Sequence, residues 1–318
     1  MKQKTFATIG FEKYRKTTRK ETFLALMENI LPWHEFERII EPYYPKPEGA
    51  GRKPIGIIRM LKIYFLQHWF QLSDPAAEEA IYDSKAFRDF VGIDLGVEPS
   101  PDETTILRFR HLLEKHNLGK KLFKTIGDYL EKHGLKVNRG TIVDATIIEA
   151  PTSTKNQKKA RDPEMKQTKK GNQWYFGMKT HIGVDSKTKI IHSVVVTSAN
   201  VHDSQIIGEL LHGNETRVWG DSAYTGQKDQ IKGSSPRAKD FTQKKSYRNK
   251  ALSEKERERN RTKSKVRAKV EHVFHILKRQ FGFRKVKYKG LMKNKNHVFV
   301  ACGLANMVMA SRKGFCRA

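Results

Sequence analysis

Apolar residues recur at helical spacing between Ser264 and Phe283, and this pattern predicts one amphipathic helix. The apolar face has the i, i+3, i+4, i+7 spacing of a stripe that packs on a core, and its members are Val266, Val270, Val273, Phe274, Leu277 and Phe281. A second stripe, roughly 100° round the helix from the first, carries Arg267, Glu271 and Lys278. One carboxylate between two cations beside a buried face suits a site that handles a metal and a phosphate. A solvated face with helix-spaced ion pairs is the more common origin of such a stripe, so this helix alone decides nothing.

Helical patterns also dominate the chain before residue 139. One helix is predicted to begin at the capping box of Thr18 and Glu21, and the Pro-rich residues 41–54 follow as a connection. We expect three helices between residues 55 and 116 and a linking helix after them. Residues 1–138 are therefore predicted to form an all-helical N-terminal domain.

The third of these helices is basic and sharply capped. It is predicted to begin at the capping box of Ser100 and Glu103, and Arg108 and Arg110 are expected to project from it. A short basic helix that follows two others is compatible with helix-turn-helix binding of DNA, and equally with an ordinary helical bundle. Both interpretations remain open at the level of the sequence.

From residue 139 onwards, β-branched and alternating patterns replace the helical ones. Residues 139–150 predict a strand, and a Lys-rich loop follows it. Residues 174–185 and 189–199 predict a β-hairpin, and a further short strand ends at Asp221. Strands combined with helices predict an α/β domain over residues 139–318.

The chain is strongly basic for its length. Its 318 residues include 62 Lys and Arg against 34 Asp and Glu, for a formal net charge of +28. Self-repulsion makes such an excess costly, so we expect a polyanionic partner, with nucleic acid favoured over a membrane. The best membrane candidate, Val298–Ala310, is shorter than the ~18–20 apolar residues that span a bilayer, and it predicts a buried helix instead.

Two further features bear on the compartment. The N-terminal residues lack the apolar core of a signal peptide. The two cysteines, Cys302 and Cys316, have neither the number nor the spacing of a disulfide framework or a zinc site. We therefore expect a reduced, cytoplasmic protein.

Three acidic residues stand out as candidates for chemistry. Asp144 lies within the predicted strand 139–150, where a carboxylate costs several kcal/mol unless cations or hydrogen bonds compensate it. Asp221 stands where a strand ends, and ligands of open α/β sheets collect outside the carboxyl ends of strands. If the two strands are neighbours, Asp144 and Asp221 converge, and Glu271 can reach them from the covering helix. Three carboxylates without a Cys or His cluster are hard ligands, which suit Mg²⁺ or Mn²⁺.

Such a site points to phosphoryl transfer. Two divalent ions about 3.5–4 Å apart stabilise the attacking and leaving oxygens of an in-line displacement at phosphorus. Arg267 and Lys278 would then neutralise or position DNA phosphates. Other residues are expected to have structural roles: Asp203 as a helix cap and Trp174–Phe176 in the strand core. A transition-metal site at His272 and His275 is disfavoured, because no third soft ligand is near in sequence.

Several segments resemble the DDE transposases of bacterial insertion sequences, specifically the insertion-sequence-five family. They are IVDATIIEAP, RDPEMKQTKKGNQWYFGMKTHIGVD, SANVHDS, RVWGDSAYTG and RTKSKVRAKVEHVFHILKRQFGF, and the similarity extends to LSDPAAEEAIYDSKAFRDFVGIDL and PDETTILRFRHLL, so it covers most of the chain. The family's helix signature is tyrosine, two residues, arginine, three residues, glutamate, six residues, and lysine or arginine. Arg267, Glu271 and Lys278 match it, whereas Ser264 stands at the tyrosine position.

The resemblance implies a ribonuclease-H-like mixed sheet with flanking helices over residues 139–318. In it, Asp144, Asp221 and Glu271 would hold Mg²⁺ or Mn²⁺, and two ions are expected. It implies a transposase that binds the terminal inverted repeats of its mobile element, cleaves the phosphodiester there and transfers the 3′-hydroxyl to target DNA. Residues 1–138 would bind DNA ends or dimerise, with Arg108 and Arg110 as candidates for end recognition.

The same resemblance sets the expected partners. Double-stranded DNA is the expected partner, a homodimer on DNA the expected assembly and the bacterial nucleoid the expected location, with neither a membrane nor a small-molecule substrate. The alternatives are a structure-specific nuclease on the same fold and a non-catalytic DNA-binding protein. An RNA-binding protein is less favoured, because it gives no reason for a carboxylate inside a strand.

Overall fold

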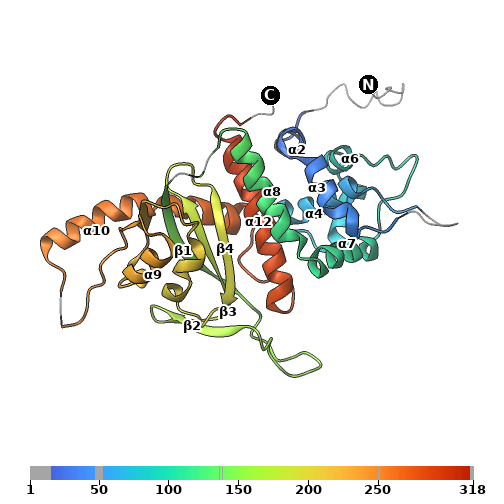
Figure 1. Cartoon of the computed structure of the whole chain (residues 1–318). Helices are drawn as coiled ribbons and strands as arrows, with labels where there is room; N and C mark the ends of the chain where they lie inside the picture. Colours follow the sequence, from blue (N-terminus) through green and yellow to red (C-terminus); the bar gives the residue numbers. More distant parts are fainter. Residues whose placement is uncertain (1–15, 47–52, 136, 138, 250, 316–318) are drawn as a thin grey trace.

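The computed structural model describes residues 16–46, 53–135, 137, 139–249 and 251–315 (Figure 1). Residues 1–15, part of the Pro-rich connection and Cys316 lie outside this part of the chain. Figure 1 shows a group of N-terminal helices on one side, a twisted sheet on the other, and the long helices α8 and α12 between them. The architecture is mixed α/β with a helical N-terminal region, in agreement with the coarse prediction.

In its described residues, the N-terminal region contains helices and no strands. Its elements are α2 (Arg19–Ile30), α3 (Trp33–Ile40), η1 (Glu41–Tyr43), α4 (Ile57–Phe70), α5 (Asp74–Asp83), α6 (Lys85–Val91), α7 (Glu103–Lys115) and α8 (Leu118–Lys132). The predicted capping box is present at Thr18, whose hydroxyl accepts from the backbone N–H of Glu21 while the Glu21 carboxylate accepts from the Thr18 N–H.

Two details of the helical prediction are wrong. Four helices, and not three, lie between residues 55 and 116, because Ser84 takes an extended backbone (φ −101°, ψ 110°) that separates α5 from α6. Helix α7 is capped by Asp102, whose Oδ1 accepts from the backbone N–H of Thr105 at 2.6 Å, and not by Ser100. Asp102 is as good a cap as serine, and it is the cap next to the helical residues.

A mixed sheet of six strands forms the second half of the molecule. Its strands are β1 (Gly140–Glu149), β2 (Lys166–Lys170), β3 (Gln173–Asp185), β4 (Ile191–Ser198), β5 (Arg217–Trp219) and β6 (Lys239–Asp240). The order is β2-β3-β1-β5-β6, with β4 paired to β3. The hairpin β3–β4 is antiparallel as predicted, and β1 and β5 are parallel neighbours, which was the condition for Asp144 and Asp221 to converge.

The sheet also shows where residue pattern misleads. The second half of the predicted Lys-rich loop is the strand β2, because backbone pairing to β3 needs no apolar side chains. Trp174 was expected in the strand core but is 64 % exposed, while Phe176, two positions further along β3, is buried.

Each face of the sheet packs on a different cluster of apolar side chains. Ile142 and Ile148 of β1 belong to the larger core, which also contains α12 (Leu291–Ser311) and the N-terminal helices. Val143, on the other face, packs with Tyr224 and with the helical segments η2 (Asp203–Leu210), η3 (Ser222–Tyr224) and α9 (Lys228–Ser234). The stretch Val298–Ala310 is buried inside α12 as predicted, and α12 contacts both α8 and β4. In the described residues, none of the helices has the length and apolar character that a bilayer crossing requires.

The predicted single helix 264–283 is interrupted. It is built from the end of α10 (Glu254–Arg267), the short α11 (Lys269–His275) and a π-helical turn, η4 (Ile276–Gln280). Its apolar stripe nevertheless faces the core, with Val270, Val273, Leu277 and Phe281 buried. The direction of the face was therefore predicted correctly, and the continuity of the helix was not.

Candidate active site

The side chains of Asp144 and Glu271 meet at Arg267. Arg267 Nη1 donates to Asp144 Oδ2 at 2.7 Å, and Nη2 donates to Glu271 Oε1 at 3.1 Å. Strand β1 supplies Asp144, the last turn of α10 supplies Arg267, and α11 supplies Glu271. The pair Arg267–Glu271 keeps its i, i+4 spacing although the helix changes at Ala268. Three residues that are 123 and 4 positions apart in the chain thus form one charged cluster.

Asp221 reaches the same level of the sheet from the neighbouring strand. The parallel register pairs Ile142 of β1 with Trp219 of β5, and Asp144 and Asp221 each follow two residues later. The Asp221 carboxylate accepts from the backbone N–H of Ala223 at 2.8 Å and so caps η3. This places Asp221 at the carboxyl end of its strand, as the sequence predicted.

Burial and the neighbouring carboxylates make Asp144 hard to ionise. Its pKa rises from 3.8 to about 6, first because burial penalises the charged form and also because Asp221 and Glu271 add negative charge. Arg267 and the backbone N–H of Ala145, which donates at 2.8 Å, oppose this rise. The side chain of Asp144 is 13 % exposed and that of Glu271 is 64 % exposed. The cluster is therefore shielded from solvent at β1 and accessible to it at α11. Concentrated negative charge of this kind favours a bound cation.

Lys278 does not join this cluster. Its ammonium group donates to the backbone carbonyl of Ile147 at 2.8 Å, and burial lowers its pKa. Straight α-helical geometry would place Lys278 on the face of Glu271, but the π turn η4 intervenes and carries more residues per turn. Ser264, at the tyrosine position of the family signature, accepts a hydrogen bond from Gln243 Nε2 at 2.6 Å.

The prediction that Arg110 projects from its helix is wrong. Its side chain is 6 % exposed, pairs with Asp74 at 2.8 Å and Glu114 at 2.9 Å, and stacks 4.1 Å from the Tyr288 ring centroid. With its guanidinium inside the protein, Arg110 is not available to DNA. Arg108, on the same helix, is exposed.

Two residues near the cluster were missed by the sequence prediction. Asp203 was expected to cap a helix, but the imidazole of His202 caps η2, and Asp203 pairs with Lys179 at 2.9 Å. Tyr224 is fully buried, and its hydroxyl finds no hydrogen-bond partner in the described part of the chain. Its pKa is raised well above its ordinary value, first by burial and then by Asp203, Asp144 and Asp221. A signal existed for Tyr224, which follows Asp221 by one helical turn, and none existed for Asp203.

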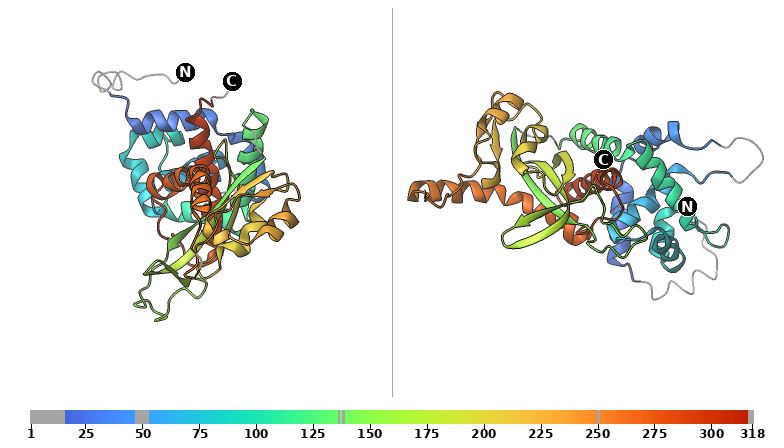
Figure 2. Two further views of the ribbon diagram at one scale, coloured as in Figure 1. Left: turned by 90° about the vertical axis from the view of Figure 1, so that its left-hand side faces the viewer. Right: turned by 90° about the horizontal axis from the view of Figure 1, so that it is seen from below.

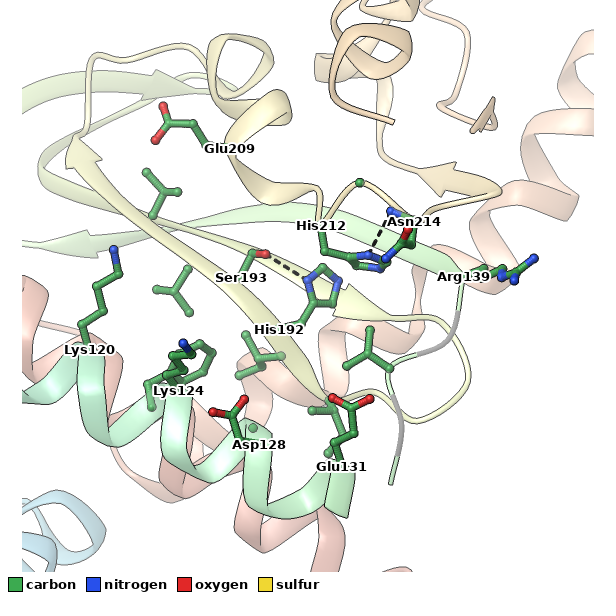
Figure 3. A pocket seen from close by; sticks show the side chains of 18 of the residues that line it. Lys120, Lys124, Asp128, Glu131, Arg139, His192, Ser193, Glu209, His212 and Asn214 are labelled. Atoms are coloured by element: carbon green, nitrogen blue, oxygen red, sulfur yellow. Dashed lines mark hydrogen bonds between the residues drawn. The ribbon is translucent and has the colours of Figure 1, made fainter. Parts of the chain in front are cut away.

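A second cluster has the residue types of a transition-metal site. The candidate ligand atoms of His192, His212 and Glu215 lie within 4.8 Å of one another beside a cavity of about 1190 Å³ between α8 and β4 (Figure 3). Glu215 is fully buried, and its carboxylate accepts from the backbone N–H groups of His212 and Gly213 and from the hydroxyls of Thr141 and Ser235.

Both nitrogens of His192 in this cluster are also occupied. Nε2 lies 3.1 Å from Thr141 Oγ1 and Nδ1 lies 2.9 Å from Ser193 Oγ. Because the carboxylate and the imidazole are satisfied by protein groups, this network holds the turn at residues 212–215 without needing an ion. It is the one group of this closeness in the described residues, so Asp144, Asp221 and Glu271 do not form a closed ligand set here. The Arg267 guanidinium stands between two of them.

Comparisons with known proteins identify the family of this chain. A family model described as "Transposase DDE domain" matches residues 136–307, which is more than half of the chain, and a second, described as a transposase domain, matches residues 12–112. Among solved structures, a piggyBac transposase synaptic complex with hairpin DNA is similar over 92 % of this chain and 74 % of that chain, with 9 % identity and a TM-score of 0.44, a likeness too loose to bear on fold or function. Both family models describe transposases, and DDE transposases are enzymes of DNA transposition. The chain belongs to the transposase DDE domain family.

Proposed function

We propose that this transposase binds the terminal inverted repeats of its own mobile element, cleaves the phosphodiester at those ends and transfers the freed 3′-hydroxyl to target DNA. It would belong to the insertion-sequence-five family, with a ribonuclease-H-like catalytic domain over residues 139–318. Residues 1–138 would bind DNA ends or dimerise. The motif matches of the sequence, the mixed sheet and the net charge of +28 support this assignment.

The observation that carries the proposal is the meeting of Asp144 and Glu271 at Arg267, with Asp221 on the adjoining parallel strand. Two carboxylates pair with one arginine, a third lies on the adjoining strand, and burial penalises the charged form of Asp144. Burial raises the pKa of Asp144 to about 6, so its charged form is less stable than that of an exposed aspartate. Such a site favours binding of a divalent cation together with a negatively charged substrate.

The donor set fits Mg²⁺ or Mn²⁺, and we propose that Asp144, Asp221 and Glu271 hold two such ions. Carboxylate oxygens are the ligands that these ions prefer, and no thiol or free imidazole competes in the cluster among the described residues. When bound, the ions would stabilise charge on the attacking and leaving oxygens at the scissile phosphate. The exposed side chain of Glu271 is free to turn towards the aspartates once Arg267 moves to a phosphate.

The remaining residues have proposed roles as DNA contacts. Arg267 would exchange its carboxylate partners for a phosphate of the scissile strand, because a guanidinium forms bidentate contacts with both groups. Lys278 would contact a neighbouring phosphate from its position against β1. Arg108, exposed on α7, is proposed as an end contact. Two ends must be held together for transposition, so we propose a homodimer on DNA, acting at the bacterial nucleoid.

Three neutral variants test the site. Asp144→Asn, Asp221→Asn and Glu271→Gln should each lower Mg²⁺-dependent cleavage of element-end DNA by at least about a thousandfold, since electrostatic stabilisation of the transition state is lost. Binding of the same DNA, measured by gel shift in EDTA, should remain within about threefold. The matched control is Glu149→Gln, an exposed carboxylate on the same strand, which should cut normally. Near-normal cleavage by any of the three site variants would refute the assignment.

A structure-specific nuclease would pass the cleavage test but would not join DNA. Pre-cut ends offered with a supercoiled target distinguish the two functions. Joined products from the wild type identify a transposase reaction. Cleavage without joining identifies the nuclease, and absence of both in Mg²⁺ and Mn²⁺ identifies a non-catalytic DNA-binding protein.

A further inference from the structure

Helix α10 leaves the body of the molecule and extends into solvent. Figures 1 and 2 show it, in orange, projecting beyond the sheet on the side away from the N-terminal helices. None of its 14 residues is buried. An isolated helix of this length is marginal in water, so an element of this kind needs local support.

The support comes from the extended residues 242–244, which run beside the helix. The Asn260 side chain accepts from the Lys244 N–H and donates to the Lys244 carbonyl. The Lys263 ammonium donates to the Thr242 carbonyl at 2.7 Å. A capping box of Ser253 and Glu256 closes the outer end. We call residues 242–249 together with α10 the basic arm; hydrogen bonds fix its shape where an apolar core does not.

The composition of the arm explains this lack of packing. Of the 14 residues in α10, seven are Lys or Arg and three are Glu. One glutamate, Glu256, pairs with Lys244 at 2.7 Å. Arg257, Arg259, Arg261 and Lys265 are exposed and have no ion pair or side-chain hydrogen bond in the described part of the chain. Like charges at i, i+4, such as Arg257 and Arg261, destabilise a helix by roughly 0.2–0.5 kcal/mol, so internal stability does not explain their presence.

The basic arm ends at the candidate active site. Arg267, the last residue of α10, forms the ion pair with Asp144. The direction of the arm is therefore set relative to the site. At ~1.5 Å per residue, α10 extends over about 21 Å, which corresponds to about six base pairs of duplex at ~3.4 Å each.

We propose that the basic arm binds the phosphate backbone of duplex DNA next to the candidate site, without reading its sequence. This inference rests on the proposed function and adds a surface to it. The occupant is nucleic acid and not a second copy of this chain. The cores of protein interfaces are depleted in Lys and Glu, but α10 is rich in both and has Val266 as its one apolar side chain.

The test neutralises four of the unpaired cations of α10 and measures binding to a random-sequence 30-base-pair duplex in EDTA. The variant Arg257→Gln, Arg259→Gln, Arg261→Gln, Lys265→Gln keeps good helix formers. We expect its affinity at 100 mM salt to fall at least tenfold, and the slope of log K against log salt to become shallower by about 2 to 4, at ~0.9 per phosphate contact. Thermal unfolding by circular dichroism should match the wild type.

The matched control is Arg257→Lys, Arg259→Lys, Arg261→Lys, which keeps every charge and should bind within about twofold of the wild type. If the Gln variant keeps the affinity and salt slope of the wild type, and the wild type binds and cleaves DNA, the proposal that the arm binds DNA is refuted and the proposed function stands. Loss of a wild-type dimer in the Gln variant without DNA, seen by light scattering, would also overturn it in favour of a protein interface. Failure of the wild type to bind DNA would overturn both.

Discussion

Two regions of this transposase contain the same small motif, an arginine that joins an aspartate to a glutamate four residues further along the chain. In the N-terminal helices, Arg110 joins Asp74 to Glu114. In the candidate active site, Arg267 joins Asp144 to Glu271. The distances are alike, at 2.7–3.1 Å, so geometry at the arginine does not distinguish them.

Access to solvent distinguishes the two motifs. The side chains of Arg110 and Glu114 are both 6 % exposed, and the guanidinium also lies against Tyr288. Around Arg267, which is 24 % exposed, Glu271 is 64 % exposed and a third carboxylate, Asp221, lies nearby. A closed motif, in which two carboxylates depend on a buried arginine, has a structural role. An open one with excess negative charge is suited to exchange its partners, which is the behaviour that a catalytic site requires.

The largest expected effect is on folding stability at the closed motif. Arg110→Ala should lower the free energy of unfolding by about 3–5 kcal/mol, because Asp74 and Glu114 would remain buried without their cation. Arg267→Ala should lower it by only about 1 kcal/mol, since Glu271 is solvated and Asp144 can take up a proton. Urea denaturation at pH 7.5 in EDTA measures both. Equal losses would show that the two motifs do not differ in the way proposed.

The next effect is a pH dependence confined to the open motif. The folded protein raises the pKa of Asp144 from 3.8 to about 6, so the folded state holds this proton more tightly than the unfolded state. The stability contributed by the protonated form is complete below about pH 4 and is lost as the pH rises through about 6, a total of about 3 kcal/mol. Asp144→Asn should therefore gain about 1–3 kcal/mol over the wild type between pH 4.5 and pH 8 in urea titrations. The exposed control Glu149→Gln should show no such gain, and a flat difference for Asp144→Asn would contradict the assigned pKa.

The smallest effect is stabilisation by metal. At ten times its dissociation constant, Mg²⁺ should stabilise the folded wild type by about 1.4 kcal/mol at pH 8, through binding to the folded state alone. The increment should shrink below pH 6, where a proton competes for Asp144, and should be largely absent in Asp144→Asn and Asp221→Asn. Differential scanning calorimetry with and without Mg²⁺ measures it. An equal increment in these variants would place the ion elsewhere, and His212→Ala would then test the second cluster.

Local pattern predicted the elements that hold the site. The β-branched run at residues 140–149, the hairpin β3–β4 and the capping box at Thr18 are all present, because they depend on residues close in sequence. The apolar stripe of residues 266–281 faces the core as expected. The three acidic positions were likewise chosen from sequence, and the parallel pairing of β1 with β5 meets the condition set for the two aspartates.

Long-range packing changed the rest. Arg108 and Arg110 lie two positions apart on one basic helix, yet Arg110 is buried, because Asp74 and Tyr288 approach it from other parts of the chain. Lys278 leaves the face of Glu271 because of a π turn that no residue in the pattern marks. Asp203 lies within electrostatic reach of Tyr224 only because η2 packs on the same face of the sheet as η3.

By itself, the sequence of this protein indicated most of its helices and strands, its basic charge and three acidic residues as candidates for the site, because periodicity, capping and composition act over a few residues. Only the tertiary structure decided that Arg110 is buried and Arg267 is accessible to solvent, that Arg267 lies between two of those carboxylates, and that α10 extends away from the body of the molecule. Burial and charge pairing bring together residues more than a hundred positions apart, such as Arg267 with Asp144 and Arg110 with Tyr288, and their free energies depend on solvent access, which only the packed molecule defines.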